Sequence, residues 1–310
     1  MQTYPDSFTC AEMLIAYLEA AAERGRRAAQ TGTVTAQIPA LADVPASKFA
    51  IAAATVDGTV AHVGDSAEPF SIQSLSKLFA LCALLRHDPN VWTEVGWDPT
   101  NAGYGSVADL ERTHGRPPNP FVNSGALVVT DRLITHTGDA SRATIELLQE
   151  LDPSAQVVSD ADVALSEALT GHRNSAIAHV LAEHGRLNND IDQVLHQYWA
   201  QCAITTTVET VANAALFLAD RRRDNSPLDG DTIRRVNAVV LTSGMYGAAG
   251  DIAYRIGLPA KSGIGGGVLA IMPGLGTVCV WSPPLDSDGN SVGGIAAIEE
   301  FARLAGWSVF

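Results

Sequence analysis

The sequence predicts an α+β protein in which one sheet is assembled from both ends of the chain and a helical lobe is inserted between them. Strand patterns occupy about residues 30–70 and 250–310, whereas about 71–249 shows mostly helical spacing. Strands from distant segments must pair to bury their apolar faces, so we expect a single sheet covered by helices. A cleft should lie between this sheet and the lobe.

An N-terminal helix is predicted over residues 7–29. Leu14, Ile15, Leu18 and Ala22 recur at helical spacing, and three arginines near the end of the segment favour a helix C-terminus. Residues 1–29 are therefore interpreted as an N-terminal helical segment that precedes the main domain.

A β-hairpin is predicted next. The apolar, β-branched run 49–56 is followed by Asp57-Gly58 and a second such run, 59–63, and Asp-Gly between two strand patterns is typical of a tight turn. Near the other end, residues 268–271 and 277–281 indicate further strands. A closing helix is expected over 294–304.

Composition excludes several classes of partner. The 34 acidic residues against 20 basic ones give a net charge of −14, which repels phosphate backbones and anionic lipids, so neither nucleic acid nor a membrane is expected. No export signal or long apolar run is recognised, which favours the cytoplasm. The arginine-rich run 221–225 is interpreted as a solvated turn.

The cysteines are widely spaced, so neither a metal site nor a disulfide framework is expected. They are Cys10, Cys82, Cys202 and Cys279.

Ser74 and Lys77 form the first candidate for catalysis. They stand three residues apart where the hairpin runs into an apolar helix, so both side chains should share one helix face. A serine hydroxyl needs an adjacent base, and a lysine can serve if burial or another cation lowers its pKa. The alternative is an ordinary helix start, with a capping serine and a solvated lysine.

A second lysine strengthens the catalytic interpretation. Lys261 begins a glycine-rich stretch, 261–267, beside a predicted strand, so the chain carries both the S-x-x-K and the K-x-G elements of penicillin-recognising enzymes. The backbone amides of Ser74 and Ile264 would then hold an oxyanion, and a charged Lys261 would help to keep Lys77 neutral. The alternative is that the glycine-rich stretch 261–267 is a flexible turn without a catalytic role.

With these residues in view, the chain resembles the glutaminase family of bacteria and animal mitochondria. The resemblance implies a serine β-lactamase-like or penicillin-binding-protein-like fold, with a mainly antiparallel sheet, and a single catalytic domain over residues 30–310. It is spread over most of the chain in seven ordered blocks: 69–77, 119–126, 166–167 with 173–174, 198 with 201–202, 244–246, 257–267 and 289–292.

The resemblance also implies roles for individual residues. Ser74 would be the nucleophile, Lys77 its base, and Tyr246 a proton shuttle, without any cofactor. Glu167 suits the ammonium of a free amino acid, and amide and hydroxyl donors suit its carboxylate. The implied substrate contacts are Ser74, Asn123, Glu167, Asn174, Tyr198, Tyr246 and Ile264. The implied activity is hydrolysis of L-glutamine to L-glutamate and ammonia by a homodimer or homotetramer.

The resemblance fails at two positions. Gln37-Ile38-Pro39 stands where family members commonly read Tyr-Ile-Pro, and that tyrosine lines the substrate, although Gln37 could still offer an amide. Gly247 replaces an aspartate found in many relatives.

Two rival functions remain open on the sequence alone. One is a penicillin-recognising hydrolase or peptidase that shares both lysines, and the other is a non-catalytic sensor that binds an amino acid in the same pocket.

Overall fold

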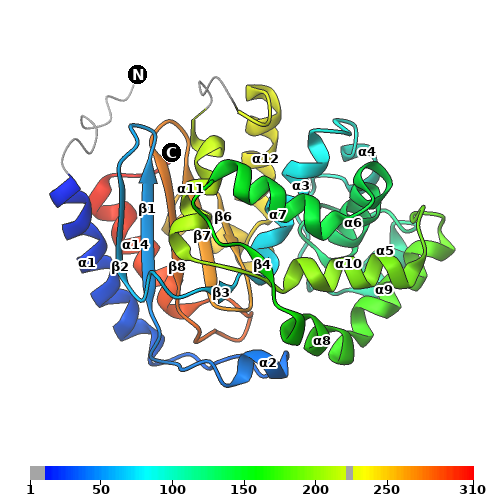
Figure 1. The fold of residues 1–310 in the computed structure, drawn as a ribbon, viewed down its shortest axis with the longest axis horizontal. Coiled ribbons are helices and arrows are strands. Elements are labelled where there is room, and N and C mark those ends of the chain that lie inside the picture. Colours follow the sequence, from blue (N-terminus) through cyan, green and yellow to red (C-terminus); the bar gives the residue numbers. More distant parts are fainter. Residues whose placement is uncertain (1–10, 221–225) are drawn as a thin grey trace.

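The centre of the protein is a five-stranded antiparallel sheet with the strand order β2-β1-β8-β7-β6. The computed structural model describes residues 11–220 and 226–310. Strands from the two ends of the chain lie side by side, because β1 pairs with β8 along its whole length and Ala52 faces Cys279 (Figure 1). The predicted union of distant segments is confirmed. The strands are β1 (Ala50–Thr55), β2 (Val60–Gly64), β6 (Ala260–Ser262), β7 (Gly267–Met272) and β8 (Gly276–Trp281).

The β1–β2 hairpin turns at Asp57-Gly58, as predicted. Gly58 has a φ of +90°, a left-handed conformation that glycine adopts without steric cost, and the amide of Thr55 donates to the carbonyl of Thr59 across the turn. β1 is buried along its whole length, whereas β2 is mostly exposed at the sheet edge. The small alanine side chains of β1 allow helices to pack closely on both faces of the sheet.

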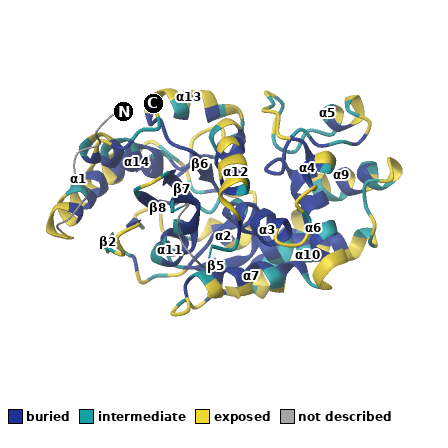
Figure 2. Ribbon diagram, turned by 90° about the horizontal axis from the view of Figure 1, so that it is seen from above, coloured by how far each residue is buried: buried dark blue, intermediate teal, exposed yellow. Residues whose placement is uncertain are grey.

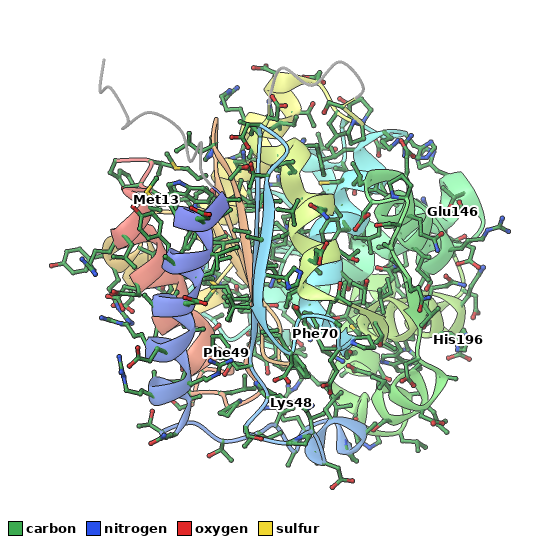
Figure 3. The ribbon with its side chains drawn as sticks, turned by 60° about the vertical axis from the view of Figure 1, so that its left-hand side comes forward. Met13, Lys48, Phe49, Phe70, Glu146 and His196 are labelled. Carbon is green, nitrogen blue, oxygen red and sulfur yellow. The ribbon has the colours of Figure 1, made fainter. Side chains whose placement is uncertain are left out.

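Two helices, α1 (Ala11–Ala29) and α14 (Val292–Ala305), cover one face of the sheet and pack against each other. Leu14 and Leu18 enter the same core as Phe49, which points from the sheet toward α1 (Figure 3). Gly25 allows this approach, because a β-carbon there would lie 2.5 Å from the Phe49 ring. Both helices were predicted, but residues 7–10 of the predicted first helix lie outside the described residues.

The opposite face of the sheet is covered by α11 (Val208–Ala219), which joins it to the helical lobe. The predicted helical character of the middle of the chain is confirmed, and Figure 1 shows the lobe to one side of the sheet. The remaining helices are α2 (Pro39–Ala42), η1 (Gln73–Leu75), α3 (Ser76–Leu85), α4 (Trp92–Val95), α5 (Val107–Arg112), α6 (Asn123–Thr137), α7 (Ala140–Leu151), α8 (Ala161–Thr170), α9 (His172–Glu183), α10 (Ile191–Cys202), α12 (Gly230–Ser243), η2 (Tyr246–Ala248) and α13 (Ala249–Arg255).

A small second sheet lies in the middle of the chain, where helical spacing alone gave no sign of it. Its order is β3-β5-β4, and its strands are β3 (Phe70–Ser71), β4 (Val158–Ser159) and β5 (Ile204–Thr206). Strands of two or three residues are too short to show an alternating pattern. This sheet matters for the site because β3 leads directly into η1 and α3.

Burial follows the layers, with the darkest ribbon in the sheet and in the lobe helices that pack on one another (Figure 2). Cys82, Cys202 and Cys279 are buried free thiols, and Cys10 lies outside the described residues. Within residues 11–220 and 226–310, no helix is both long enough and apolar enough to cross a bilayer. The arginine-rich run 221–225, interpreted above as a turn, lies in the undescribed part.

Candidate active site

Ser74 lies in a sharp connection between β3 and α3. The preceding residue, Gln73, has a φ of +49°, which is uncommon for a residue other than glycine and costs conformational energy. The side chain of Gln73 fixes this turn, because its Nε2 donates to Oγ of Ser71 at 3.1 Å. The strained turn presents Ser74 to a cavity instead of burying it in the core.

Lys77 stands in the first turn of α3 with only 3% of its surface exposed. Its Nζ donates to the carbonyl oxygen of Phe121 at 3.2 Å and to Oδ1 of Asn123 at 2.7 Å. Burial lowers the pKa of Lys77 to about 8, although nearby Cys202 and Glu167 act in the opposite direction. Among the described residues, the hydrogen bonds of Lys77 go to these two oxygens and not to Ser74.

The neutral form of Lys77 matches its surroundings. A neutral amine has two N–H donors and one lone pair, and the oxygens of Phe121 and Asn123 accept from both donors. The lone pair is then free to take a proton. This environment is therefore suited to a base.

Lys261 lies in the edge strand β6 and is completely buried. Its Nζ donates to the hydroxyl of Tyr246 at 3.1 Å and to the carbonyl of Ser262 at 2.6 Å. Burial lowers the pKa of Lys261 to about 8, and the charge of Lys77 also lowers it. The two lysines thus disfavour simultaneous protonation.

Tyr246 connects the two lysines. Its ring centroid is 4.4 Å from Nζ of Lys261 and 5.7 Å from Nζ of Lys77, within the range of cation–π attraction. Tyr246 opens η2 with a φ of +53°, so it is a second strained residue in the site. Its ring faces the same cavity as Ser74.

Ile264 lies in the tight turn between β6 and β7, which packs against the nucleophile segment. A β-carbon on Gly263 would lie 2.7 Å from the carbonyl oxygen of Ile72 and 3.2 Å from the amide nitrogen of Ser74, so only glycine allows this approach. Among residues 11–220 and 226–310, neither the amide of Ser74 nor that of Ile264 donates to another protein atom. Both amides are available to bind an anion.

Three polar side chains from three helices meet beside Lys77. Nδ2 of Asn123 donates to Oδ1 of Asn174 at 2.8 Å, and the hydroxyl of Tyr198 donates to Oδ1 of Asn123 at 3.4 Å. Burial raises the pKa of Tyr198 well above its ordinary value, so this hydroxyl stays protonated. Asn123 is therefore the hub of a network that leaves Nδ2 of Asn174 to face a ligand.

Glu167 supplies a buried carboxylate, with only 6% of its surface exposed. Burial raises its pKa to about 7, while the amide of Gln73 and the charge of Lys77 act in the opposite direction. Cys202 is no rival to Ser74 as a nucleophile, because burial raises the pKa of its thiol to about 12. Any cationic ligand group in the cavity would favour the ionised form of Glu167.

All nine residues implied for the site come together around one cavity of about 450 Å³. Lys77 and Lys261 lie behind its wall and hydrogen-bond to lining residues. Several lining residues were not foreseen from the sequence, because they stand in loops or helices without a recognisable motif. The lining residues are Gln37, Ile38, Gln73, Ser74, Tyr104, Gly105, Asn123, Glu167, Thr170, Gly171, Arg173, Asn174, Tyr198, Cys202, Tyr246 and Ile264.

Comparison with curated proteins points to one family. The sequence model of the family described as Glutaminase matches residues 32–310. A protein named Glutaminase from Streptomyces coelicolor is 45% identical, over 94% of this chain and 97% of the relative. A Glutaminase from Shewanella loihica is 40% identical, over 94% of this chain and 98% of the relative.

Solved structures agree with the sequence comparison. A structure described as probable glutaminase YbaS superposes with a TM-score of 0.90 at 33% identity, covering 97% of this chain and 99% of the other. A probable glutaminase from Bacillus subtilis complexed with 6-diazo-5-oxo-L-norleucine gives a TM-score of 0.82 at 29% identity, covering 97% of each chain. The predicted β-lactamase-like α+β fold is confirmed by these neighbours. Because the family match spans nearly the whole chain, the protein belongs to the glutaminase family.

Proposed function

We propose that this chain is a glutaminase that hydrolyses L-glutamine to L-glutamate and ammonia through a covalent intermediate on Ser74. The observation that carries the proposal is the single cavity in which Ser74 shares a wall with the buried carboxylate of Glu167. A free amino acid with a side-chain amide needs both an anion for its ammonium and a nucleophile for its amide carbon. The relatives named Glutaminase support the same substrate.

Substrate binding uses the polar groups that surround the cavity. Glu167 pairs with the α-ammonium, which favours ionisation of this carboxyl. Nδ2 of Asn174 is placed to donate to the α-carboxylate, and the hydroxyl of Tyr198 can donate to it after turning away from Oδ1 of Asn123. These contacts direct the side-chain amide toward Ser74 and fix its orientation.

Acylation begins when Oγ of Ser74 attacks the amide carbon and its proton passes to the lone pair of Lys77. The amides of Ser74 and Ile264 hold the resulting oxyanion, and each such donor lowers the barrier by about 3 kcal/mol. Collapse of the tetrahedral intermediate breaks the C–N bond. The departing nitrogen takes the proton from Lys77, with Tyr246 as the proposed relay, and leaves as ammonia.

Deacylation repeats these steps with water as the nucleophile. Lys77 takes a proton from the water as the new C–O bond forms, and the oxyanion returns to the same two amides. The ester bond then breaks, Oγ of Ser74 recovers its proton, and L-glutamate is released. Lys261 contributes through its coupling to Lys77: the charge of Lys77 lowers the pKa of Lys261, and by reciprocity a charged Lys261 would disfavour protonation of Lys77 between the two steps.

A related structure supports the covalent route. It is described as the covalent complex between the Bacillus subtilis glutaminase YbgJ and 5-oxo-L-norleucine, formed by reaction with 6-diazo-5-oxo-L-norleucine. That protein is 29% identical to this chain with a TM-score of 0.82. An electrophilic glutamine analogue that labels a relative is expected to label Ser74 here.

The wider organisation follows from the same proposal. Residues 30–310 would form one catalytic domain behind the N-terminal segment 1–29, acting in the cytoplasm as a homodimer or homotetramer. The net charge of −14 supports action away from nucleic acid and anionic membranes.

The decisive experiment measures ammonia and glutamate released from L-glutamine by the wild type, Ser74→Ala and Ser287→Ala. Ser287 is an exposed serine that does not line the cavity, and it serves as the matched control. L-asparagine and a chromogenic lactam are tested in parallel. We expect the wild type and the control to release equimolar ammonia and glutamate from glutamine, and Ser74→Ala to release neither. The melting temperature of Ser74→Ala should equal that of the wild type, which shows that the variant is folded.

Other outcomes would redirect the assignment. Turnover of the lactam but not of glutamine, lost in Ser74→Ala, would support a penicillin-recognising hydrolase. Binding of glutamine without any turnover would support a sensor. Glutamine turnover that survives in Ser74→Ala would overturn the assigned nucleophile.

A further inference from the structure

Tyr104 makes two contacts at the cavity that no catalytic motif foretells. It lies in the loop between α4 and α5, and its hydroxyl donates to Oε1 of Gln37 at 3.3 Å. Its ring packs on that of Tyr246, with centroids 5.2 Å apart and planes tilted by 47°. Both Tyr104 and Gln37 line the cavity that contains Ser74. One side chain thus joins a loop at the cavity edge to the tyrosine that connects the two lysines.

Gln37 belongs to a segment that is held at both ends. Upstream, the backbone of Thr33 exchanges two hydrogen bonds with Leu285, which follows the last sheet strand. Downstream, the amide of Ala40 donates to Oγ of Ser166 in α8. Gln37 itself is exposed, so it stands at the solvent side of the cavity. The bond to Tyr104 therefore connects a segment fixed to the sheet and α8 with a loop of the lobe.

The Tyr104 loop is anchored to the substrate network. The carbonyl oxygen of Tyr104 accepts a hydrogen bond from the amide of Asn123 at 2.8 Å. Burial raises the pKa of the Tyr104 phenol, so its hydroxyl stays protonated and donates. The backbone of Tyr104 is thus tied to the residue that holds Lys77, while its hydroxyl reaches outward to Gln37.

Tyr246 needs support because its backbone is strained. With a φ of +53°, it would relax unless neighbouring groups held it. Lys261 contacts its hydroxyl from one side, and the ring of Tyr104 packs on its ring. Tilted aromatic pairs at this separation are attractive beyond their burial. The Tyr104 ring therefore contributes to keeping Tyr246 over the two lysines.

We propose that Tyr104 is a positioning residue with two separable tasks. Its hydroxyl holds Gln37 at the edge of the cavity through a hydrogen bond, and its ring holds the ring of Tyr246 in place. The proposal rests on the proposed glutaminase function. Gln37 stands where the resemblance stated above expects a tyrosine, so the hydrogen bond from Tyr104 to Gln37 involves a position at which this chain departs from that expectation. The hydroxyl is expected to affect substrate binding, and the ring is expected to affect the chemical step.

The test separates the two tasks with four variants. Tyr104→Phe removes only the donor and Gln37→Leu only the acceptor. Each should raise KM for glutamine about threefold, because a long neutral hydrogen bond contributes little, with kcat within about twofold of wild type. The double variant should be no worse than either single one, since both remove the same bond. Tyr104→Leu should also lower kcat roughly tenfold or more and move the ascending limb of its pH profile, because Tyr246 loses its support.

Tyr254→Phe is the matched control, because Tyr254 is 90% exposed and lies outside the cavity. Its kinetics should equal those of wild type. Dissociation constants for L-glutamine with each variant in the Ser74→Ala background give a readout that does not require turnover. These dissociation constants keep this proposal distinct from the proposed function. A wild type that releases no ammonia would overturn the function, whereas the dissociation constants of the variants would still test the hydrogen bond from Tyr104 to Gln37.

Three results would overturn the proposed roles of Tyr104, and a fourth would show that they are not separable. The first is an unchanged KM and dissociation constant in both Tyr104→Phe and Gln37→Leu. The second is additive effects in the double variant, which would mean that the two side chains act independently. The third is a Tyr104→Leu variant with the kcat and the pH profile of wild type. A variant that binds no glutamine at all also counts against separable tasks.

Discussion

Oδ1 of Asn123 lies 2.7 Å from Nζ of Lys77, while Nδ2 of the same side chain donates to Asn174. One amide thus joins the proposed base to the proposed carboxylate site. Because an amide is neutral, it orients the lysine without raising its pKa as a carboxylate would. The pKa of Lys77 can therefore stay near 8 inside the protein.

Asn123→Asp should test this relationship directly. A carboxylate at this position would raise the pKa of Lys77 by about 1–2 and keep it protonated. We expect kcat/KM at pH 7.5 to fall roughly tenfold or more and to recover in part above pH 9. Asn90→Asp, at an exposed position, should leave the profile unchanged. An identical pH profile for Asn123→Asp and wild type would contradict Lys77 as the base.

Glu167 should make substrate binding depend on pH near neutrality. Its pKa is raised to about 7, so the carboxylate is lost as pH falls through 7, and KM for glutamine should rise below that value. Glu167→Gln should raise KM by roughly 30- to 1,000-fold, the loss expected for a buried charge pair, and should abolish this pH dependence. The exposed Glu183→Gln serves as control. A pH-dependent KM that persists in Glu167→Gln would assign the titration to another group.

Gly263→Ala should damage the oxyanion turn while leaving the fold intact. The new β-carbon would lie 2.7 Å from the carbonyl oxygen of Ile72, so the turn that carries Ile264 must move away from Ser74. We expect kcat to fall at least about 100-fold, the loss typical of one oxyanion donor. Gly230→Ala is the control, because its β-carbon would meet no atom within 4 Å. Equal kcat values for the two variants would argue against Ile264 as a donor.

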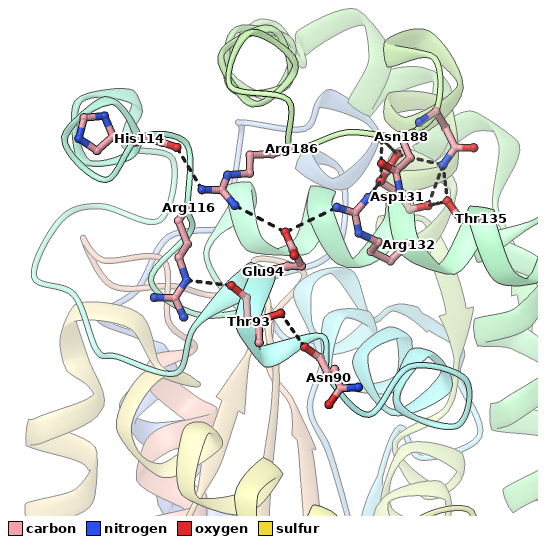
Figure 4. Close-up of polar contacts among 11 residues, drawn as sticks. Asn90, Thr93, Glu94, His114, Arg116, Asp131, Arg132, Thr135, Arg186 and Asn188 are labelled. Carbon is pink, nitrogen blue, oxygen red and sulfur yellow. Dashed lines mark hydrogen bonds and ion pairs between the residues drawn. The ribbon is translucent and has the colours of Figure 1, made fainter.

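Asp131 should be a major determinant of lobe stability. It is completely buried, accepts hydrogen bonds from the amides of Asn188 and Asn189, and contacts Arg132, which reaches toward Glu94 (Figure 4). Asp131→Asn removes the charge and turns one acceptor oxygen into an NH2 group, which then faces the donating amides of Asn188 and Asn189. We expect a loss of about 3 kcal/mol in the free energy of unfolding and a melting temperature lower by roughly 5–10 °C.

The exposed Asp288→Asn provides the comparison for Asp131→Asn, and both are measured by thermal and denaturant unfolding. The kcat of the folded Asp131→Asn variant should stay near that of wild type, since Asp131 does not line the cavity. Equal stability of the two variants would show that the lobe does not depend on this carboxylate.

Strong local signals made part of the fold predictable. Asp57-Gly58 predicted the hairpin because this dipeptide between two strand patterns favours a tight turn, and the apolar spacing of Leu14 and Leu18 predicted α1. The strands β3, β4 and β5 were missed because two or three residues carry no periodicity. Their pairing is set by tertiary contacts, which a single sequence does not display.

The site was predictable only as far as its motifs reach. The spacing of Ser74 and Lys77 predicted that both side chains share one helix face. It did not predict the hydrogen bond that Lys77 makes to Asn123. Glu167 and Asn174 came from resemblance alone, since each is unremarkable on its own helix. Tyr104 and Thr170 line the cavity without any motif, because loop conformation and helix packing bring them there.

The pairing of β1 with β8 governs when this enzyme can first work during synthesis. β1 ends at Thr55, but its neighbour in the sheet runs from Gly276 to Trp281, so the ribosome must make more than 200 intervening residues before the sheet can close. Lys261 and Ile264 emerge in the same late stretch, long after Ser74. A nascent chain therefore carries Ser74 and Lys77 for most of translation without Lys261 and without the oxyanion donor Ile264. Joining such distant strands also makes closure of this sheet a slow step in folding.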